Sequence, residues 1–351
     1  MRPLFYIHQA SCISPQETFQ QVNLDTLHNP VGKKMLSVEP GYENIPLGIL
    51  RRMGRAVRIG VGAAIPIIKE TTATDGIIIG TANGGMEDCF KFLNQIIQYE
   101  EGQLTPGNFV QSTTNAIAAQ LGILNSNKSY NITHVHRGLS FENAVIDAAM
   151  QLVENKNNSY LLGAVDEISA YNFNIEYLGN WYKDEEITAS ELYTSDTKGS
   201  IAGEGAAMFL VNNEKENAIA KMQAIHMVHS EDEELVQHQL RHFIDTHLPA
   251  GEKIDLLLSG ENGDNRILKY YTVAEHLMDE DVTIARFKHM TGEFTTASAI
   301  ATWLAIHILQ QQQMPAHMIK RAGHTSTYKN ILICNNYRGV QHGFILIRPV
   351  A

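Results

Sequence analysis

Short apolar runs bounded by Gly, Asn or Asp alternate along the chain with longer stretches of helical periodicity. This alternation is typical of layered α/β folds, in which the short runs form buried strands. The pattern predicts strands at 76–82, 159–165, 206–211, 253–260, 330–336 and 342–347. It predicts helices at 49–70, 87–100, 141–154, 232–247, 266–278 and 295–312. In the last helix, the apolar stripe of Ile300, Leu304 and Ile308 predicts a face that packs in the core.

The polar stretch 212–217 is the best candidate for a junction between two parts of the chain. With 351 residues, of which 44% are hydrophobic, the chain is long enough for one large domain or two closely joined halves. We therefore expect an N-terminal half at 1–213 and a C-terminal half at 214–351.

Composition narrows the class of protein. Charged residues make up 19% of the chain, no apolar run reaches the roughly 18 to 20 residues of a membrane span, and the start MRPLFYIHQA lacks the apolar core of a signal peptide. We expect a soluble cytoplasmic protein. A net charge of -11 argues against nucleic acid as the main partner. Cys12, Cys89 and Cys334 are too few and too scattered for a disulfide framework or a metal site.

Arginines form one local exception to the acidic composition. Arg51, Arg52, Arg55 and Arg58 are spaced to occupy much of one face of the predicted helix 49–70. This face could meet an acidic carrier protein, or it could be an ordinary solvated helix face.

Six segments, in chain order, resemble segments of the β-ketoacyl synthases. They are GIIIGTANGGMED, PGNFVQSTTNAIAAQLGI, LLGAVDEIS, GSIAGEGAAMFLV, FKHMTGEFTTASA and CNNYRGVQHGFILI, and together they extend over about four fifths of the chain. The resemblance implies a thiolase-like fold, which is a duplicated α/β/α/β/α layered sandwich that dimerises through its first half. It also implies an acyl carrier protein as partner, and no metal or other cofactor.

The resemblance further implies a defined chemistry. In that family a cysteine at a tight strand-to-helix turn takes an acyl group from the carrier, and the helix N-terminus lowers the pKa of its thiol. Two histidines then assist malonyl decarboxylation and stabilise the enolate oxygen, while a lysine supports the second histidine.

Carried over residue by residue, three of these four positions are substituted. Counting back without gaps from LLGAVDEIS places the cysteine position at Gly138, and a shift of two residues would place it at His136. The two histidine positions fall on Asn262 and Glu293, and only Lys288 is kept. An ionised carboxylate at Glu293 would repel an enolate, so the residues oppose the family's condensation chemistry.

Two other glycine segments of the family are kept, and the glycines of the closing loop are lost. The Gly203–Glu204–Gly205 segment and the glycine turn at 80–85 are kept, as though the scaffold matters. The closing loop reads NNYRGVQH and has lost glycines, which removes backbone freedom near the acyl chain. Acyl gating of the family kind is therefore not expected.

Several further side chains are candidates for chemistry. His134 and His136 alternate at the end of an expected strand, so both could face a cavity, an interface or a metal, or could make structural hydrogen bonds. Ser140 could act as a nucleophile or cap the next helix. His238, His242 and His247 lie along one helix without the adjacent carboxylate of a metalloprotease motif, and we interpret them as surface or packing residues.

Three functions follow from these observations. The leading hypothesis is a non-condensing partner of an active ketosynthase, similar to the chain-length factors of polyketide or aryl-polyene systems. The second is an acyl-thioester enzyme with altered chemistry, such as an acyltransferase, hydrolase or decarboxylase, that uses Ser140, His136, Asn262 or Glu293. The third is a non-catalytic binder of acyl carrier protein that uses the arginine face.

Overall fold

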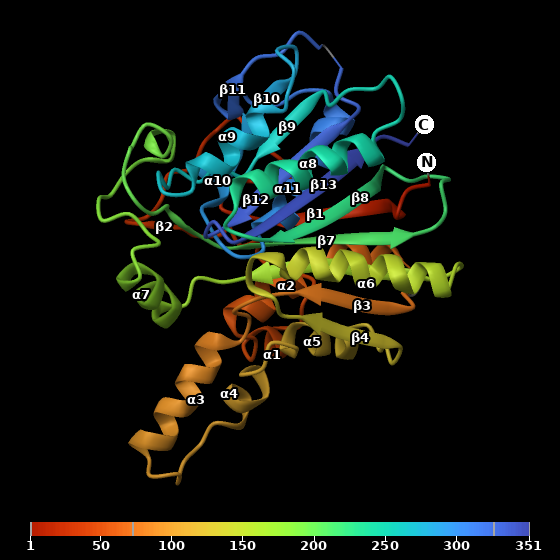
Figure 1. Cartoon of the computed structure of the whole chain (residues 1–351). Helices are drawn as coiled ribbons and strands as arrows, with labels where there is room; N and C mark the ends of the chain where they lie inside the picture. Colours follow the sequence, from red (N-terminus) through yellow and green to blue (C-terminus); the bar gives the residue numbers. More distant parts are fainter. Residues whose placement is uncertain (1, 72–73, 326, 351) are drawn as a thin grey trace.

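The computed structural model describes residues 2–71, 74–325 and 327–350, so the outermost residues of both predicted halves lie outside it. Its strands form one continuous sheet in the order β11-β10-β9-β12-β13-β8-β1-β7-β5-β3-β4 (Figure 1). The strands are β1 (Phe5–Ile13), β3 (Gly76–Gly80), β4 (Tyr130–His134), β5 (Ser159–Asp166), β7 (Gly205–Asn212), β8 (Ala220–His229), β9 (Leu256–Ser259), β10 (Thr283–Arg286), β11 (Ile319–Arg321), β12 (Ile331–Tyr337) and β13 (Gln341–Arg348), with β2 (Lys34–Met35) and β6 (Ala202–Gly203) as a separate pair.

The sheet repeats one arrangement twice. In the first half, β1 pairs antiparallel with β7, β7 antiparallel with β5, and β5, β3 and β4 are parallel. In the second half, β8, β13, β12, β9 and β10 follow each other with the same order and the same directions. The two halves meet where β1 pairs with β8. This repeat confirms the duplicated fold expected from the sequence.

Helices complete the layers. They are α1 (Leu47–Leu50), α2 (Arg55–Glu70), α3 (Met86–Gln98), α4 (Pro106–Gln111), α5 (Ala116–Leu124), α6 (Ser140–Glu154), α7 (Ala170–Leu178), α8 (Glu233–His247), α9 (Leu268–His276), α10 (Lys288–Thr291) and α11 (Ala297–Gln311). The central layer consists of α6 and α11, which contact each other and strands of both halves. One outer layer contains α2 and α5, and the other contains α8 and α9. The expected core stripe of α11, Ile300, Leu304 and Ile308, is buried there.

Each predicted strand and helix is present, with one helix corrected. The expected helix 49–70 is split into α1 and α2, because residues 51–54 are not helical and Gly54 is the N-cap of α2. The start of α2 is held by the carboxylate of Glu167, which accepts a hydrogen bond from the backbone N–H of Ala56 (2.9 Å). Strands β1, β2, β6, β8, β10 and β11 were not predicted, and of β4 only the end near His134 was expected. Both β1 and β8 are only partly buried along their length, so they lack a continuous apolar run.

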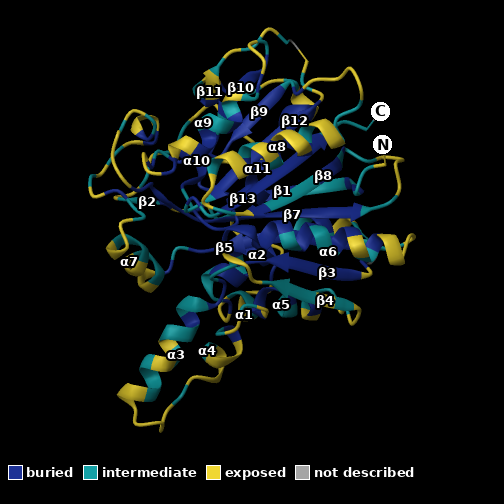
Figure 2. Cartoon of the chain, viewed as in Figure 1, coloured by how far each residue is buried: buried dark blue, intermediate teal, exposed yellow. Residues whose placement is uncertain are grey.

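An arm formed by α3 and α4 projects from the body of the molecule (Figure 1). Although α3 is amphipathic, Asp88 is its only buried residue, and Figure 2 shows the arm as largely exposed or half-buried. Exposed apolar side chains lie along it, including Ile97 (77% exposed), Phe109 (60%) and Val110 (68%). Within the described residues, no helix is both long enough and apolar enough to span a bilayer.

A buried carboxyl lies in the first turn of α6, inside the central layer. Glu142 is 0% exposed, and among the described residues neither of its carboxyl oxygens has a hydrogen-bond partner. Burial raises the pKa of Glu142 to about 7. The folded protein therefore holds a proton on Glu142 at a pH where the unfolded chain has released it.

This proton sets a pH dependence of stability. The pKa is raised above its unfolded value of 4.5, so the free energy of unfolding falls as pH rises from about 4.5 to about 7 and then levels off. Glu142→Gln removes this loss, which amounts to roughly 3 kcal/mol above pH 7. Thermal denaturation should show the variant gaining stability relative to the native chain at pH 8, with the gain shrinking towards pH 5.

Glu154→Gln is the matched control, since Glu154 lies at the exposed end of the same helix. It should leave the pH profile unchanged. An equal profile for Glu142→Gln and the native chain would show that Glu142 is not the buried proton acceptor.

Candidate functional site

Three of the four positions carried over from the ketosynthases meet in one hydrogen-bonded network. The ammonium of Lys288, which is 0% exposed at the start of α10, lies 2.7 Å from Oε1 of Glu293. The other oxygen of Glu293 accepts a hydrogen bond from Nδ2 of Asn262 (2.7 Å). Asn262 is thus brought to Lys288 and Glu293, which follow it by 26 and 31 positions, at one end of the second half's strands.

In this network, the amide of Asn262 and the carboxylate of Glu293 have hydrogen-bond partners on both of their polar atoms. Oδ1 of Asn262 accepts a hydrogen bond from the backbone N–H of Asp264 (3.1 Å), so both ends of its amide are used. Each oxygen of Glu293 has one partner, from Lys288 and from Asn262. Burial and the nearby charge of Glu293 raise the pKa of Tyr182 far above its ordinary value, so this phenol remains protonated. The cluster is arranged to hold a buried ion pair.

The strand-to-helix turn between β4 and α6 holds the fourth position. Its backbone is strained at Arg137, which has φ 50° although it is not a glycine. The side chain of Tyr337 lies directly against Gly138, and Oε1 of Gln341 accepts a hydrogen bond from the Gly138 N–H (3.0 Å). No residue of the turn 135–139 is a cysteine. The assignment of the cysteine position to Gly138 within this turn stays a prediction.

The hydroxyl of Ser140 closes the same turn. It accepts a hydrogen bond from the N–H of His136 (2.8 Å) and donates one to the carbonyl of Arg137 (2.9 Å). Ser140 is fully buried at the first position of α6. The expectation that it caps the helix is therefore corrected, because its hydrogen bonds run backwards to the turn and not to the helix N–H groups.

The two histidines near the turn lie in different surroundings. Nε2 of His134 is 2.8 Å from Oδ2 of Asp147 on α6, and the hydroxyl of Tyr130 donates to the same carboxylate (3.1 Å). His136 is exposed. His134 thus has a partner for the structural hydrogen bond that was one of the alternatives expected from the sequence. Among the described residues, no group of three or more His, Cys, Asp or Glu side chains is placed to hold a metal ion.

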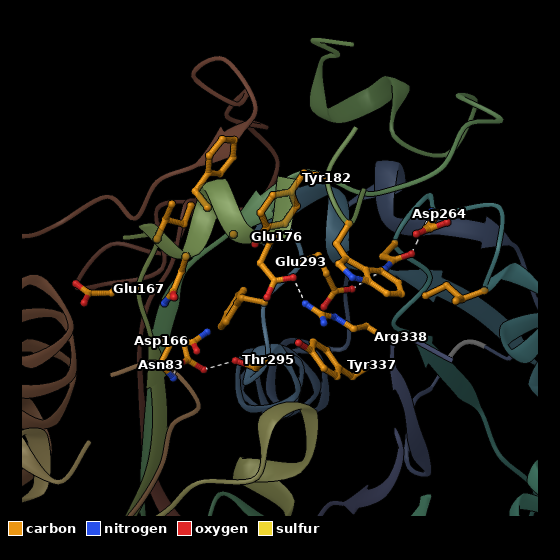
Figure 3. A pocket seen from close by; sticks show the side chains of 18 residues that line it. Asn83, Asp166, Glu167, Glu176, Tyr182, Asp264, Glu293, Thr295, Tyr337 and Arg338 are labelled. Carbon is orange, nitrogen blue, oxygen red and sulfur yellow. Dashed lines mark hydrogen bonds and ion pairs between the residues drawn. The ribbon is translucent and has the colours of Figure 1, made fainter. Parts of the chain in front are cut away.

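A small cavity lies beside the network, between α7 and the β12–β13 hairpin (Figure 3). It encloses about 50 Å³, which is room for a few water molecules and not for an acyl chain. Arg338 pairs with Glu176 of α7 across it, and the guanidinium of Arg338 lies 4.6 Å from the ring centre of Trp181. The cavity is lined by Asn83, Asp166, Glu167, Ile168, Asn172, Phe173, Glu176, Trp181, Tyr182, Gly203, Asn262, Asp264, Ile267, Glu293, Phe294, Thr295, Tyr337 and Arg338.

Asp166, at the end of β5, connects the two halves at the edge of this cavity. Its carboxyl oxygens accept hydrogen bonds from Thr81 and from the N–H groups of Ala82 and Asn83 in the first half. They also accept from the hydroxyls of Thr295 (2.5 Å) and Thr296 (2.9 Å) in the second half. Burial raises the pKa of Asp166, although these donors favour the carboxylate.

Asp166 and Tyr337 were not singled out from the sequence, although both lie inside segments that resemble the family. For Tyr337 the available signal was its place in the closing loop, which has lost glycines. For Asp166 the signal was weaker, because its five donors come from distant segments.

The predicted arginine face is also corrected. Arg51 and Arg52 are exposed but precede α2, so the four arginines do not share one helix face. Arg55 bonds Glu204 through Nε (3.1 Å), and Arg58 bonds Glu39 through Nη2 (2.9 Å). Because two of the four charges are already paired within the chain, the basic surface is weaker than the sequence indicated.

The sequence matches the family description "Beta-ketoacyl synthase, N-terminal domain" over residues 29–242. This match extends over more than half of the chain. The chain belongs to the beta-ketoacyl synthase family. A search of curated proteins gave no match to the sequence.

Solved structures of this family share the fold at low sequence identity. A beta-ketoacyl synthase from Burkholderia phymatum STM815 is 14% identical with a TM-score of 0.75, and 100% of both chains is covered. The ishigamide ketosynthase/chain length factor is 13% identical with a TM-score of 0.78, again over 100% of both chains. A ketosynthase in complex with its chain length factor from Xenorhabdus doucetiae is 13% identical with a TM-score of 0.77 over 98% of both chains.

The ion pair of Lys288 and Glu293 can be tested by removing one or both of its charges. Glu293→Gln leaves the ammonium of Lys288 buried without its carboxylate, and we expect the free energy of unfolding to fall by about 3–5 kcal/mol. Adding Lys288→Met should recover much of this loss, because the unpaired charge is removed as well. Chemical denaturation of both single variants and the double variant measures the coupling.

Glu216→Gln, an exposed carboxylate in the connection between β7 and β8, should have almost no effect. Additive losses in the double variant would show that Lys288 and Glu293 do not depend on each other.

Proposed function

We propose that this chain is a non-condensing, chain-length-factor-like subunit that pairs with an active ketosynthase in fatty acid or polyketide biosynthesis of the aryl-polyene or pigment type. The reaction that it supports is carried out on the partner, which supplies the thiol and the histidines. The chain itself contributes a folded surface and no group that forms a thioester.

One observation carries this proposal: the polar groups at the positions that would perform condensation are bonded to other groups of the chain. Decarboxylation of a malonyl thioester requires hydrogen-bond donors aimed at the developing enolate oxygen. Here the amide of Asn262 donates to Glu293, the ammonium of Lys288 pairs with Glu293, and the N–H of Gly138 donates to Gln341. A negative carboxylate occupies the centre of the cluster, where it would oppose further negative charge.

The exposed arm supports a role that requires a partner. Ile97, Phe109 and Val110 place apolar surface in solvent, where contiguous patches typically mark interaction sites. The strand β4 lies at the edge of the sheet with free backbone groups along one side, and Val135 just beyond it is exposed. Both features belong to the first half, through which the resemblance implies dimerisation.

The size of the cavity supports the same reading. The cavity beside the substituted positions, at about 50 Å³, does not accommodate a growing acyl chain, and we infer that the acyl tunnel lies in the partner or between the two subunits. A chain-length factor shapes its partner's tunnel in this way without binding the acyl group covalently.

Release of carbon dioxide from malonyl-carrier protein, with an acyl-carrier primer present, tests the proposal. We expect no turnover from the folded chain alone and restored turnover with a cognate ketosynthase. Substitutions in this chain distinguish its own turnover from that of a contaminating ketosynthase, which they would leave unchanged. Turnover by the chain alone that is lost in one of His136→Ala, Ser140→Ala, Asn262→Ala or Glu293→Gln, each shown to be folded, would establish that the chain is itself an enzyme and would overturn the proposal.

Pairing through the arm gives a separate test. Ile97→Glu and Phe109→Glu place charge on the apolar surface, and each should reduce capture of a co-expressed ketosynthase without lowering the melting temperature, since both side chains are exposed. Leu235→Glu is the matched control, because Leu235 is an exposed apolar residue on α8 of the other half (43% exposed). Undiminished capture by both arm variants would place the partner elsewhere.

A further inference from the structure

The end of the β12–β13 hairpin packs against the strand-to-helix turn between β4 and α6. Tyr337 and Gln341 are cross-strand partners at the end of this hairpin, and both contact Gly138. A Cβ atom added at Gly138 would lie 2.2 Å from the Cβ of Tyr337. Since the Cβ of Tyr337 is fixed by the backbone of β12, a change of rotamer cannot relieve this overlap.

Gln341 occupies the polar groups of the turn. Its Oε1 accepts a hydrogen bond from the N–H of Gly138 (3.0 Å), and its Nε2 lies 3.5 Å from the carbonyl oxygen of His136. The backbone donor of Gly138, in the short 3-10 turn that precedes α6, is therefore not available to a ligand. Without this bond, a free N–H near a helix N-terminus would attract an oxyanion.

The tip of the hairpin is itself held in one conformation. Arg338 and Gly339 both have positive φ, and the N–H of Gly339 donates to Oδ1 of Asn336 (2.8 Å). Arg338 pairs with Glu176 on α7, so the tip is anchored on its far side as well. The hairpin tip is thus fixed by contacts with the Gly138 turn, with Asn336 and with Glu176 of α7.

We propose that residues 337–341 are a built-in plug that seals this turn against any acyl group. The plug deepens the proposed function, because it makes the chain unable to accept an acyl group even if a thiol were restored at position 138. Tyr337 excludes the side chain and Gln341 occupies the backbone donor. Loss of condensation is then a property of the hairpin as well as of the missing cysteine.

A cycle of substitutions tests the contact. Gly138→Ala should lower the melting temperature by several degrees, because the added Cβ overlaps that of Tyr337 and not because of its backbone angle, which lies outside the left-handed region. The penalty should persist with Tyr337→Ala, which keeps a Cβ, and should largely disappear with Tyr337→Gly, which removes it. If Gly138→Ala does not fold alone, recovery of folded protein in the Tyr337→Gly background gives the same result.

An engineered thiol then tests the plug directly. With Cys89→Ser in place, Gly138→Cys combined with Tyr337→Gly should react with iodoacetamide and accept an acyl group from an acyl thioester, releasing the free carrier thiol. With Tyr337→Ala in the same chain, both reactions should be much slower.

Either of two results would overturn the inference: an equal Gly138→Ala penalty in the Tyr337→Ala and Tyr337→Gly backgrounds, or equal thiol reactivity in both. These measurements use the isolated chain, so they are independent of whether it pairs with a ketosynthase. Failure of pairing with an intact cycle would reject the proposed function and leave the plug standing.

Discussion

The fully buried ammonium of Lys288 constrains the rest of the site. A charge of this kind is stable inside a protein only when a carboxylate of good geometry and further hydrogen bonds compensate its loss of water. Glu293 provides the carboxylate and Asn262 fixes its orientation. Asn262 and Glu293 therefore depend on each other, because the carboxylate needs a donor on its second oxygen and the amide supplies it.

The glycine segment that this chain shares with the family has a structural role. Glu204, at the centre of the kept glycine segment, is fully buried and accepts hydrogen bonds from Arg55 and from the N–H groups of Ser37 and Ile168. Gly203 lies against the carbonyl of Thr291, where a Cβ would be only 2.1 Å away. The contact of Gly203 with Thr291 joins the two halves, whereas the hydrogen bonds of Glu204 lie within the first half. These features have a structural role whether or not a reaction takes place.

The candidate site is built from both halves. The turn after β4 follows a parallel strand of the first half, and the loop after β9 follows a parallel strand of the second. Asp166 and the Thr295–Thr296 pair join the two halves. The hairpin of the second half then reaches the turn of the first, which is how Tyr337 comes to lie on Gly138.

The sequence by itself determined the α/β class, most of the strands and helices, the buried stripe of α11 and the absence of a thiol at the strand-to-helix turn. These properties depend on local periodicity and on residue identity, which a linear pattern records. The partly buried strands β1 and β8 escaped because half-exposed strands mix polar and apolar residues. The break before α2 also escaped, since the long apolar pattern continues across Gly54.

Only the tertiary structure decided what the substituted positions do. That Glu293 would neutralise Lys288, that Arg55 and Arg58 would be paired internally, and that Gln341 would occupy the Gly138 N–H all depend on contacts between segments far apart in the chain. Hydrogen bonds and ion pairs act over a few ångströms in space, whatever the separation in sequence. Residue identity predicted that the family's catalytic positions are substituted, whereas the fold shows which contacts the residues at these positions make.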